Sequence, residues 1–417
     1  VGIAGFTACL IFLSSVWSSA DFEKTMVRDP GTIMDFRVDY VSGLIAVSPD
    51  RARLYEPEVQ ELWFRKSAAF GCDSLPVSYF PYTPLFLLIT IPLSQLPFNS
   101  AFAIWSIGGW LSAAAALFAL RQTTPGRSGL ALPVMAAALS SIPAARCLVL
   151  GQMSFLYVGL LCGYFRGIIQ KNNWLIASML ALTAIKPQVF VFFVIPIFAL
   201  QRWRALILTA LLGLTAAGTV ALITTPETVL SYPSAFLSVL LKGHTSANPQ
   251  EMVCLRGFLT GLLPAAIASA LAWFLALAGM IATFLLWRTS PLNEKTLPWL
   301  ICATVLLYVV SGPHVHLYDC LLLSIAAITT LSGGGLAQAL NPRGALRSWC
   351  IMLLLYPFAG WALFLYAGDD GPTLFRAHTL INMALLFCAM VRLRAAINSA
   401  NVPVQLTDGD SLNGQEA

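Results

Sequence analysis

Long hydrophobic segments follow one another along almost the whole chain and are separated by short polar connections. The first covers residues 1–20, and it is read as a helix that stays in the protein. Further apolar runs occupy 83–97, 99–120, 130–150, 152–168, 173–185, 188–201, 205–224, 258–287, 296–311, 317–331, 349–366 and 375–394. Most approach the roughly 20 residues that a helix needs to cross a bilayer. The pattern predicts an all-α polytopic membrane protein with about 12 transmembrane helices.

Three of these runs, 83–97, 173–185 and 188–201, are too short to cross a membrane comfortably. A helix of about 13 residues is about 20 Å long, whereas the hydrocarbon core is about 30 Å thick. The connection between the last two contains Lys186 and Pro187. It is therefore expected below the outer surface, where a lysine is costly unless it is paired or binds an anion.

The basic residues between the runs fall into clusters that alternate regularly with the apolar segments. The pairs are Arg121/Arg127, Arg166/Lys171, Arg202/Arg204, Arg288/Lys295, Arg343/Arg347 and Arg392/Arg394. The positive-inside rule assigns all of them to the cytoplasmic side. The opposite side then receives a first outer loop at 21–82 and a second at 226–256. We expect one membrane domain over 1–395 and a disordered cytoplasmic tail over 396–417.

The first outer loop carries a mixed apolar and polar pattern over 36–47 and again over 56–66. Such a pattern is typical of short amphipathic helices that lie on the membrane surface. Asp35 and Asp39 stand four residues apart, so a helix would place them on one face. They are either a general base and its neighbour or two solvated acids, and spacing alone does not choose between them.

Composition supports the membrane assignment and excludes several classes of protein. The chain is 58% hydrophobic and 10% charged, with a mean hydropathy of +0.77, whereas soluble domains are about a quarter charged. The net charge of +5 is too small to indicate nucleic-acid binding. The chain has no phosphate-binding GxxxxGK[ST], no GxGxxG and no HExxH motif, which argues against a nucleotide-driven pump.

Polar residues of the outer connections form the candidate site. His314, His316 and Asp319 have a spacing that suits a metal, a phosphate or simply a polar helix entrance. Lys186 is either an anion contact in the membrane or a lysine that reaches the interface. The remaining candidates share only this outer location, and they are Tyr82, Gln152 and Arg256.

Five segments together resemble glycosyltransferase family 87 of the GT-C superfamily, whose best-known members are polyprenol-phosphate-mannose-dependent α-mannosyltransferases. The likeness covers roughly 1–395. The segments are DFRVDYVSGLIAVSPDRARLY (35–55), YFPYTPLFLLITIPLSQLPF (79–98) with Trp105, GQMSFLYVGLL (151–161), AIKPQVFVFFVIP (184–196) with RWRAL (202–206), and SGPHVHLYDCLLL (311–323). The chain departs from the family pattern at two places. The family often has a Tyr near the position of Asp39, and it commonly has a double Pro where this chain has Thr83-Pro84.

The resemblance implies an inverting hexosyltransferase in the inner (plasma) membrane with its active site facing the periplasm or exterior. It would move a sugar from a polyprenyl-phosphate donor to a lipid or glycan acceptor. No cofactor, metal or nucleic acid is implied. Asp35 matches the family's catalytic base, with Asp39 as the alternative. Lys186 and Gln152 match donor-binding positions, with His314, His316 and Arg256 as candidate helpers. Asp319 and Tyr82 are candidates for binding the sugar or the acceptor.

A transporter or lipid-linked-sugar flippase is the alternative interpretation. Such proteins are typically built from internal repeats with matched broken helices near the membrane midplane. This chain has one strongly broken pair, around Lys186, and no clear repeat between its halves. The pattern therefore favours the glycosyltransferase.

Overall fold

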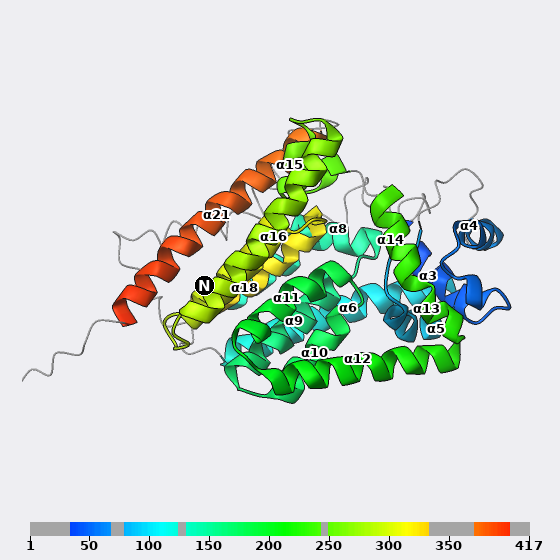
Figure 1. Cartoon of the computed structure of the whole chain (residues 1–417), viewed down its shortest axis with the longest axis horizontal. Coiled ribbons are helices and arrows are strands. Elements are labelled where there is room, and N and C mark those ends of the chain that lie inside the picture. The colour runs from blue at the N-terminus through cyan, green and yellow to red at the C-terminus, as the bar shows by residue number, and fades with distance from the viewer. Residues whose placement is uncertain (1–33, 68–78, 124–130, 243–248, 333–370, 401–417) are drawn as a thin grey trace, which may run out of the picture.

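The computed structural model describes residues 34–67, 79–123, 131–242, 249–332 and 371–400 (Figure 1). Within these ranges every regular element is a helix, apart from an isolated β-bridge between Met252 and His316. The prediction of an all-α membrane protein is therefore confirmed. The first predicted helix, 1–20, and the apolar run 349–366 lie outside the described residues.

The α-helices follow the apolar pattern of the chain, with short 3₁₀ turns between some of them. In the first half they are α3 (Met34–Ala46), α4 (Pro57–Lys66), α5 (Leu87–Ser94), α6 (Phe98–Thr123), α7 (Ala131–Leu139), α8 (Ile142–Leu150), α9 (Ser154–Ile169), α10 (Asn173–Thr183) and α11 (Pro187–Ala199). In the second half they are α12 (Trp203–Ile223), α13 (Pro226–Leu230), α14 (Tyr232–Lys242), α15 (Leu255–Thr260), α16 (Ala265–Thr289), α17 (Leu297–Ser311), α18 (Leu323–Ser332) and α21 (Gly371–Ala400). The 3₁₀ turns are η3 (Arg51–Arg53), η5 (Pro84–Phe86), η6 (Pro249–Glu251) and η7 (Leu317–Leu322).

Four of the described helices are long and apolar enough to cross a membrane, namely α6, α12, α16 and residues 375–400 of α21. In Figure 1, α12 runs along the lower edge, and α16 and α21 cross the left half of the molecule. A fifth span results if α8 and α9 are counted together. The described residues thus contain fewer full spans than the roughly 12 predicted, because several apolar runs form short or bent helices.

The apolar stretch around Gly151 forms a sharp bend rather than two simple spans. The axes of α8 and α9 differ by 119° across the break at residues 151–153. Gly151 adopts the left-handed φ of 68°, which suits glycine. Its carbonyl accepts a 2.7 Å hydrogen bond from the Trp105 indole on α6. The predicted span 130–150 is also divided, because α7 ends at Leu139 and the Ser141 side chain caps the start of α8.

A second break separates α10 from α11. These helices have 11 and 13 residues, so at about 1.5 Å per residue neither spans the bilayer. Pro187 occupies the first turn of α11, where its missing N–H is no loss. Lys186 therefore lies between the two short helices. The Thr83 N–H donates to the Ile185 carbonyl at 3.1 Å, which brings the start of η5 beside this break.

The segment predicted as the first outer loop contains two helices, α3 and α4, near the positions predicted from its pattern. α3 packs against α5 and is buried on several faces, since Phe36, Val41 and Ile45 are enclosed together with Arg37 and Asp39. It differs in this respect from the surface helix expected. An amphipathic pattern does not distinguish a helix that faces lipid from one that is covered by neighbouring protein elements.

The segment predicted as the second outer loop, 226–256, contains helices α13 and α14 and the turn η6. One predicted boundary changes, at the start of the tail. α21 continues to Ala400, so residues 396–400 belong to a helix rather than to a tail. The rest of the predicted tail, 401–417, lies outside the described residues.

Close packing of α3 on α5 gives a stability prediction at Gly43. A Cβ atom at this position would overlap the backbone carbonyl of Thr90, which cannot move as a side chain can. We expect Gly43→Ala to lower the free energy of unfolding by about 1–3 kcal/mol. Thermal unfolding in detergent would be followed by the exposure of buried thiols such as Cys162 and Cys302 to a reactive dye.

The matched control is Gly213→Ala on α12, where a Cβ would meet no atom within 4 Å. This change should be neutral or stabilising, because alanine is the better helix former by about 1 kcal/mol. Equal unfolding temperatures for the two variants would contradict the tight contact between α3 and α5.

Candidate active site

A buried ion pair between Lys186 and Asp319 lies at the centre of the polar residues. The Lys186 ammonium lies 3.2 and 3.3 Å from the two carboxylate oxygens of Asp319. The two residues are 4% and 3% exposed. Lys186 comes from the break between α10 and α11, and Asp319 comes from η7, before α18. Asp319 thus supplies the anionic partner that a lysine in an apolar region needs.

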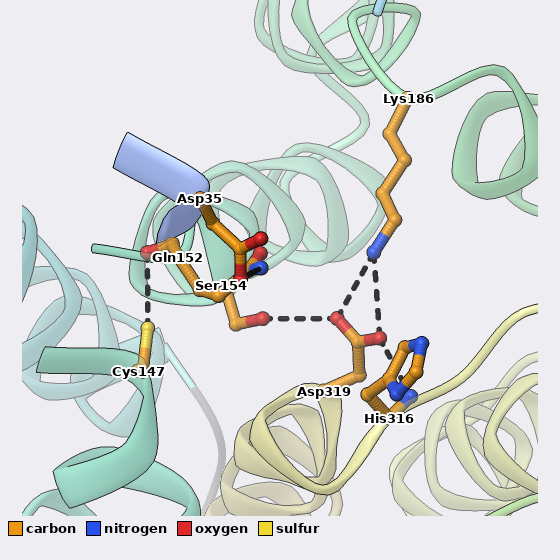
Figure 2. Close-up of polar contacts among 7 residues, drawn as sticks. All are labelled: Asp35, Cys147, Gln152, Ser154, Lys186, His316 and Asp319. Atoms are coloured by element: carbon orange, nitrogen blue, oxygen red, sulfur yellow. Dashed lines mark hydrogen bonds and ion pairs between the residues drawn. The ribbon is translucent and has the colours of Figure 1, made fainter. Parts of the chain in front are cut away.

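Two further groups donate hydrogen bonds to the Asp319 carboxylate (Figure 2). The Ser154 hydroxyl donates to Oδ1 at 2.9 Å, and the backbone N–H of His316 donates to Oδ2 at 3.1 Å. Ser154 is the first residue of α9, directly after the 151–153 bend. Asp319 therefore joins the bend, the lysine break and η7 in one network, and each of its carboxylate oxygens accepts at least two bonds.

Asp35 lies beside the same bend and is held by Gln152. The Gln152 side-chain amide donates to Oδ2 of Asp35, and the Cys147 thiol donates to the Gln152 carbonyl at 3.0 Å (Figure 2). Burial raises the pKa of Asp35 above its ordinary value, and the bond from Gln152 and the charge of Lys186 lower it in part. This carboxylate is thus a weakly solvated acceptor close to a cation.

Asp39 lies one helical turn after Asp35 on α3 but has a different environment. It is 3% exposed, and its Oδ1 has no hydrogen-bond partner within the described part of the chain. Burial raises the pKa of Asp39 well above its ordinary value, and the negative charge of Asp35 raises it further. These effects favour the neutral acid more strongly at Asp39 than at Asp35, whose pKa is lowered in part by Gln152 and Lys186.

Tyr82 lies close to all three acids. Burial raises the pKa of its phenol well above the ordinary value, and the charges of Asp39, Asp35 and Asp319 add to that shift. The Tyr55 hydroxyl donates to the Tyr82 carbonyl at 2.9 Å, which connects this residue to the turn that follows η3. Tyr82 is therefore a neutral hydroxyl group beside the carboxylates.

The two histidines lie beside the ion pair, with His314 packed edge-to-face on His316 and His316 stacked on Tyr318. The ring centroids of His314 and His316 are 4.7 Å apart, and those of His316 and Tyr318 are 5.3 Å apart. Burial lowers the pKa of His314 well below its ordinary value and that of His316 to about 4. At neutral pH these imidazoles are uncharged, so they offer N–H donors rather than the cations considered from the sequence.

Arg256 fixes the turn that carries the histidines. Its guanidinium donates to the Pro313 carbonyl at 3.2 Å, and the Val253 N–H donates to the Val315 carbonyl at 2.9 Å. These bonds attach the start of α15 to residues 312–316. Arg256 is half-buried and adds positive charge near His314 and His316.

The described fold brings most candidate residues into one cluster. Asp35 with Gln152 and Lys186 with Asp319 are direct pairs, while Tyr82, His314 and His316 lie around them. Sequence reasoning missed Ser154, although a hydroxyl two residues after Gln152 in an otherwise apolar run was a usable signal. Trp105 was noted from the sequence, but the hydrogen bond that its indole donates to the Gly151 carbonyl was not predicted.

Among the described residues no group of three or more His, Cys, Asp or Glu side chains is arranged to hold a metal ion. The spacing of His314, His316 and Asp319 had suggested such a site as one interpretation. In the structure the Asp319 carboxylate is engaged by Lys186 and by the His316 backbone instead. That the enzyme needs no metal or cofactor stays a prediction.

The polar cluster thus combines carboxylates, an amide and a lysine at two helix breaks inside an all-helical domain with candidate membrane spans. The sequence model of glycosyltransferase family 87 matches residues 80–313, more than half of the chain, and the chain belongs to this family. It is a glycosyltransferase. No curated protein is similar enough to this chain to count as a match.

The matched range is shorter than the expected 1–395. It contains Tyr82, Gln152, Lys186 and Arg256, but it begins after both aspartates of α3 and ends just before His314. The residues outside this range enter the cluster through contacts with residues inside it.

The ion pair supports a prediction on stability. Lys186→Met and Asp319→Leu should each lower the free energy of unfolding by about 3–5 kcal/mol, because each leaves an unpaired buried charge. The double variant removes both charges and should recover most of that loss. Thermal unfolding of all three variants in one detergent measures the difference.

A control for general charge effects is Glu56→Gln, which breaks an exposed pair with Arg53. It should leave the unfolding temperature nearly unchanged. A double variant as unstable as the sum of the single variants would show that the two residues do not act as a pair.

Proposed function

We propose that this enzyme transfers a sugar from a polyprenyl-phosphate donor to a lipid or glycan acceptor on the outer face of the cell membrane, with inversion. The observation that carries the proposal is the partly buried Asp35 carboxylate, which accepts a hydrogen bond from Gln152 and lies close to the Lys186 ammonium. A base and a cation side by side match the two charges that sugar transfer creates.

Asp35 would act as the general base. The attacking acceptor hydroxyl must lose its proton while its oxygen bonds to the anomeric carbon, and Asp35 would take that proton. Burial makes this carboxylate a better base than a solvated one, because its raised pKa favours proton uptake. Asp39, whose environment favours the neutral acid, is less suited to this role.

Lys186 would stabilise the leaving group. The bond between the anomeric carbon and the phosphate oxygen breaks as the acceptor attacks, and the electron pair leaves with the polyprenyl phosphate. An ammonium group has three N–H donors, and the Asp319 carboxylate accepts two of its bonds. The third could bind a phosphate oxygen while the ion pair stays intact. Arg256 and the neutral His314 would add positive charge and a donor at the same place.

A lipid-carried donor fits the architecture of the chain. The helices around the cluster are apolar, and four of those described are candidate membrane spans. A polyprenyl chain can reach such a site sideways through the bilayer. The basic clusters of the sequence support placing the opposite, outer ends of the helices at the site. Mannose is the sugar suggested by the family resemblance.

The base assignment predicts a large difference between the two aspartates. Asp35→Asn should lower the transfer rate by about 10²–10⁴-fold, the usual contribution of a general base. Asp39→Asn is the matched comparison, since an amide resembles the neutral acid that burial favours, and its loss should be much smaller. Transfer from radiolabelled polyprenyl-phosphate mannose by purified protein measures both.

A large loss in Asp39→Asn together with normal turnover in Asp35→Asn would reassign the base to Asp39. Incorporation of sugar only from a nucleotide donor would overturn the proposed function as a whole.

The hydrogen bond from Gln152 predicts a change in pH dependence. A general base works only when ionised, so activity should rise with pH through the pKa of Asp35. Gln152 lowers that pKa. Gln152→Ala should therefore move the acid limb of the kcat/KM profile to higher pH as well as slow the reaction. Ser154→Ala, which removes a bond to Asp319 instead, should leave the position of that limb unchanged.

An acid limb at the same pH in wild type and Gln152→Ala would show that the amide does not tune the base. The profiles should be recorded with the donor well below its KM, so that they report ionisations of the free enzyme.

A further inference from the structure

An apolar cavity lies between α5, α6 and α9. Its volume is about 330 Å³, within the usual range of about 300–1,000 Å³ for ligand sites. The residues that line it are mostly hydrophobic or glycine, among them Ile104, Trp105, Gly108 and Phe155, and its polar members are Ser112 and Gln152. None of them carries a charge.

One end of this cavity reaches the candidate active site. Gln152, which lines the cavity, is the residue that binds the Asp35 carboxylate. Trp105 forms another part of the wall, and its indole holds the carbonyl of the neighbouring Gly151. A molecule in the cavity would therefore lie against the bend that positions the proposed base.

The other end reaches the outer surface of α6. Ile104 and Gly108 line the cavity and are exposed, and Ile107 and Leu111 continue the exposed apolar surface along the same helix. α6 is one of the candidate membrane spans, so this surface would face lipid hydrocarbon. The cavity thus connects a hydrocarbon-facing surface with the polar cluster.

We infer that this cavity holds the hydrocarbon tail of the acceptor and that the acceptor is therefore a lipid. The inference rests on the proposed function, since it takes Asp35 as the base. The tail would lie along α5, α6 and α9, and the headgroup hydroxyl would stand beside Asp35 and Gln152. The apolar lining stabilises a tail by removing it from solvent, and the single amide at the inner end suits a polar headgroup.

The tail of the donor is the competing occupant, and the positions of the charges argue against it. In an inverting transfer the attacking and leaving oxygens lie on opposite faces of the sugar. The cavity meets the cluster on the side of the base. Of the residues considered for donor binding, Lys186, Arg256 and His314 do not line the cavity. Gln152 does line it, but its side-chain amide is bonded to the proposed base Asp35.

Gly108 allows the cavity to be filled without disturbing the protein. A Cβ at this position would meet no atom within 4 Å, so a larger side chain would enter the open space. We expect Gly108→Leu to lower kcat/KM for the acceptor by about tenfold or more, since it displaces several methylene groups of the tail. Gly213→Leu, on the candidate span α12 and equally unobstructed, should leave the rate unchanged.

The assay supplies radiolabelled polyprenyl-phosphate mannose and a total lipid extract of the native membranes to purified protein in nanodiscs. The expected product is soluble in organic solvent and survives the mild acid that cleaves the donor. Its formation should be slowed by Gly108→Leu and not by Gly213→Leu. The kinetic constants for acceptor and donor are measured separately, with each held at saturation in turn.

Three outcomes would overturn the inference. A water-soluble glycan product formed equally fast by Gly108→Leu would mean that the acceptor has no tail in this cavity. A loss that saturating donor abolishes would assign the cavity to the donor tail. A lower unfolding temperature for Gly108→Leu than for Gly213→Leu without added lipid would show that the new side chain meets protein atoms rather than open space for a tail. Absence of any transfer by the wild type would instead reject the proposed function.

Discussion

The placement of one buried charge pair determines how the site of this enzyme is assembled. Lys186 and Asp319 lose almost all contact with water, which costs free energy that only close pairing and further hydrogen bonds can offset. Ser154 and the His316 backbone supply those bonds. The bend at 151–153, the break before α11 and the turn before α18 must therefore come together for the protein to fold. That requirement also holds Gln152 next to Asp35, so the same network that balances the buried charge positions the proposed base.

Much of the fold follows from simple properties of the sequence. Composition and long apolar runs are sufficient to predict an all-helical membrane protein. The short runs beside Pro187 also correctly predicted a break at Lys186. The sequence predicted that this lysine is paired or binds an anion, because an isolated ammonium in an apolar setting is unfavourable. The identity of the acid was not predictable. Asp319 is far from Lys186 in sequence, and no local pattern specifies which of several polar residues will meet it.

Other features depended on tertiary packing that periodicity does not encode. The apolar stretch 130–150 has the composition of a single span, but Ser141 begins a new helix within it and Gly151 turns the chain back. α3 has the pattern of a surface helix, but α5 covers it closely enough that Gly43 admits no side chain. Asp35 and Asp39 are equivalent by spacing, and only their neighbours distinguish them. One accepts a bond from Gln152, while the other is enclosed with an oxygen that lacks a hydrogen-bond partner among the described residues.

The two pairs at the centre of the site each join a residue inside the region matched by the family to one outside it. Gln152 and Lys186 lie within residues 80–313, whereas Asp35 precedes that region and Asp319 follows it. Replacing one member of either pair leaves a buried polar group without its complement, so change at one position constrains what is acceptable at the other. Among relatives, residues at the positions of Gln152 and Lys186 should therefore covary with those at Asp35 and Asp319, which lie outside the matched region. A family definition confined to residues 80–313 contains only one residue of each pair.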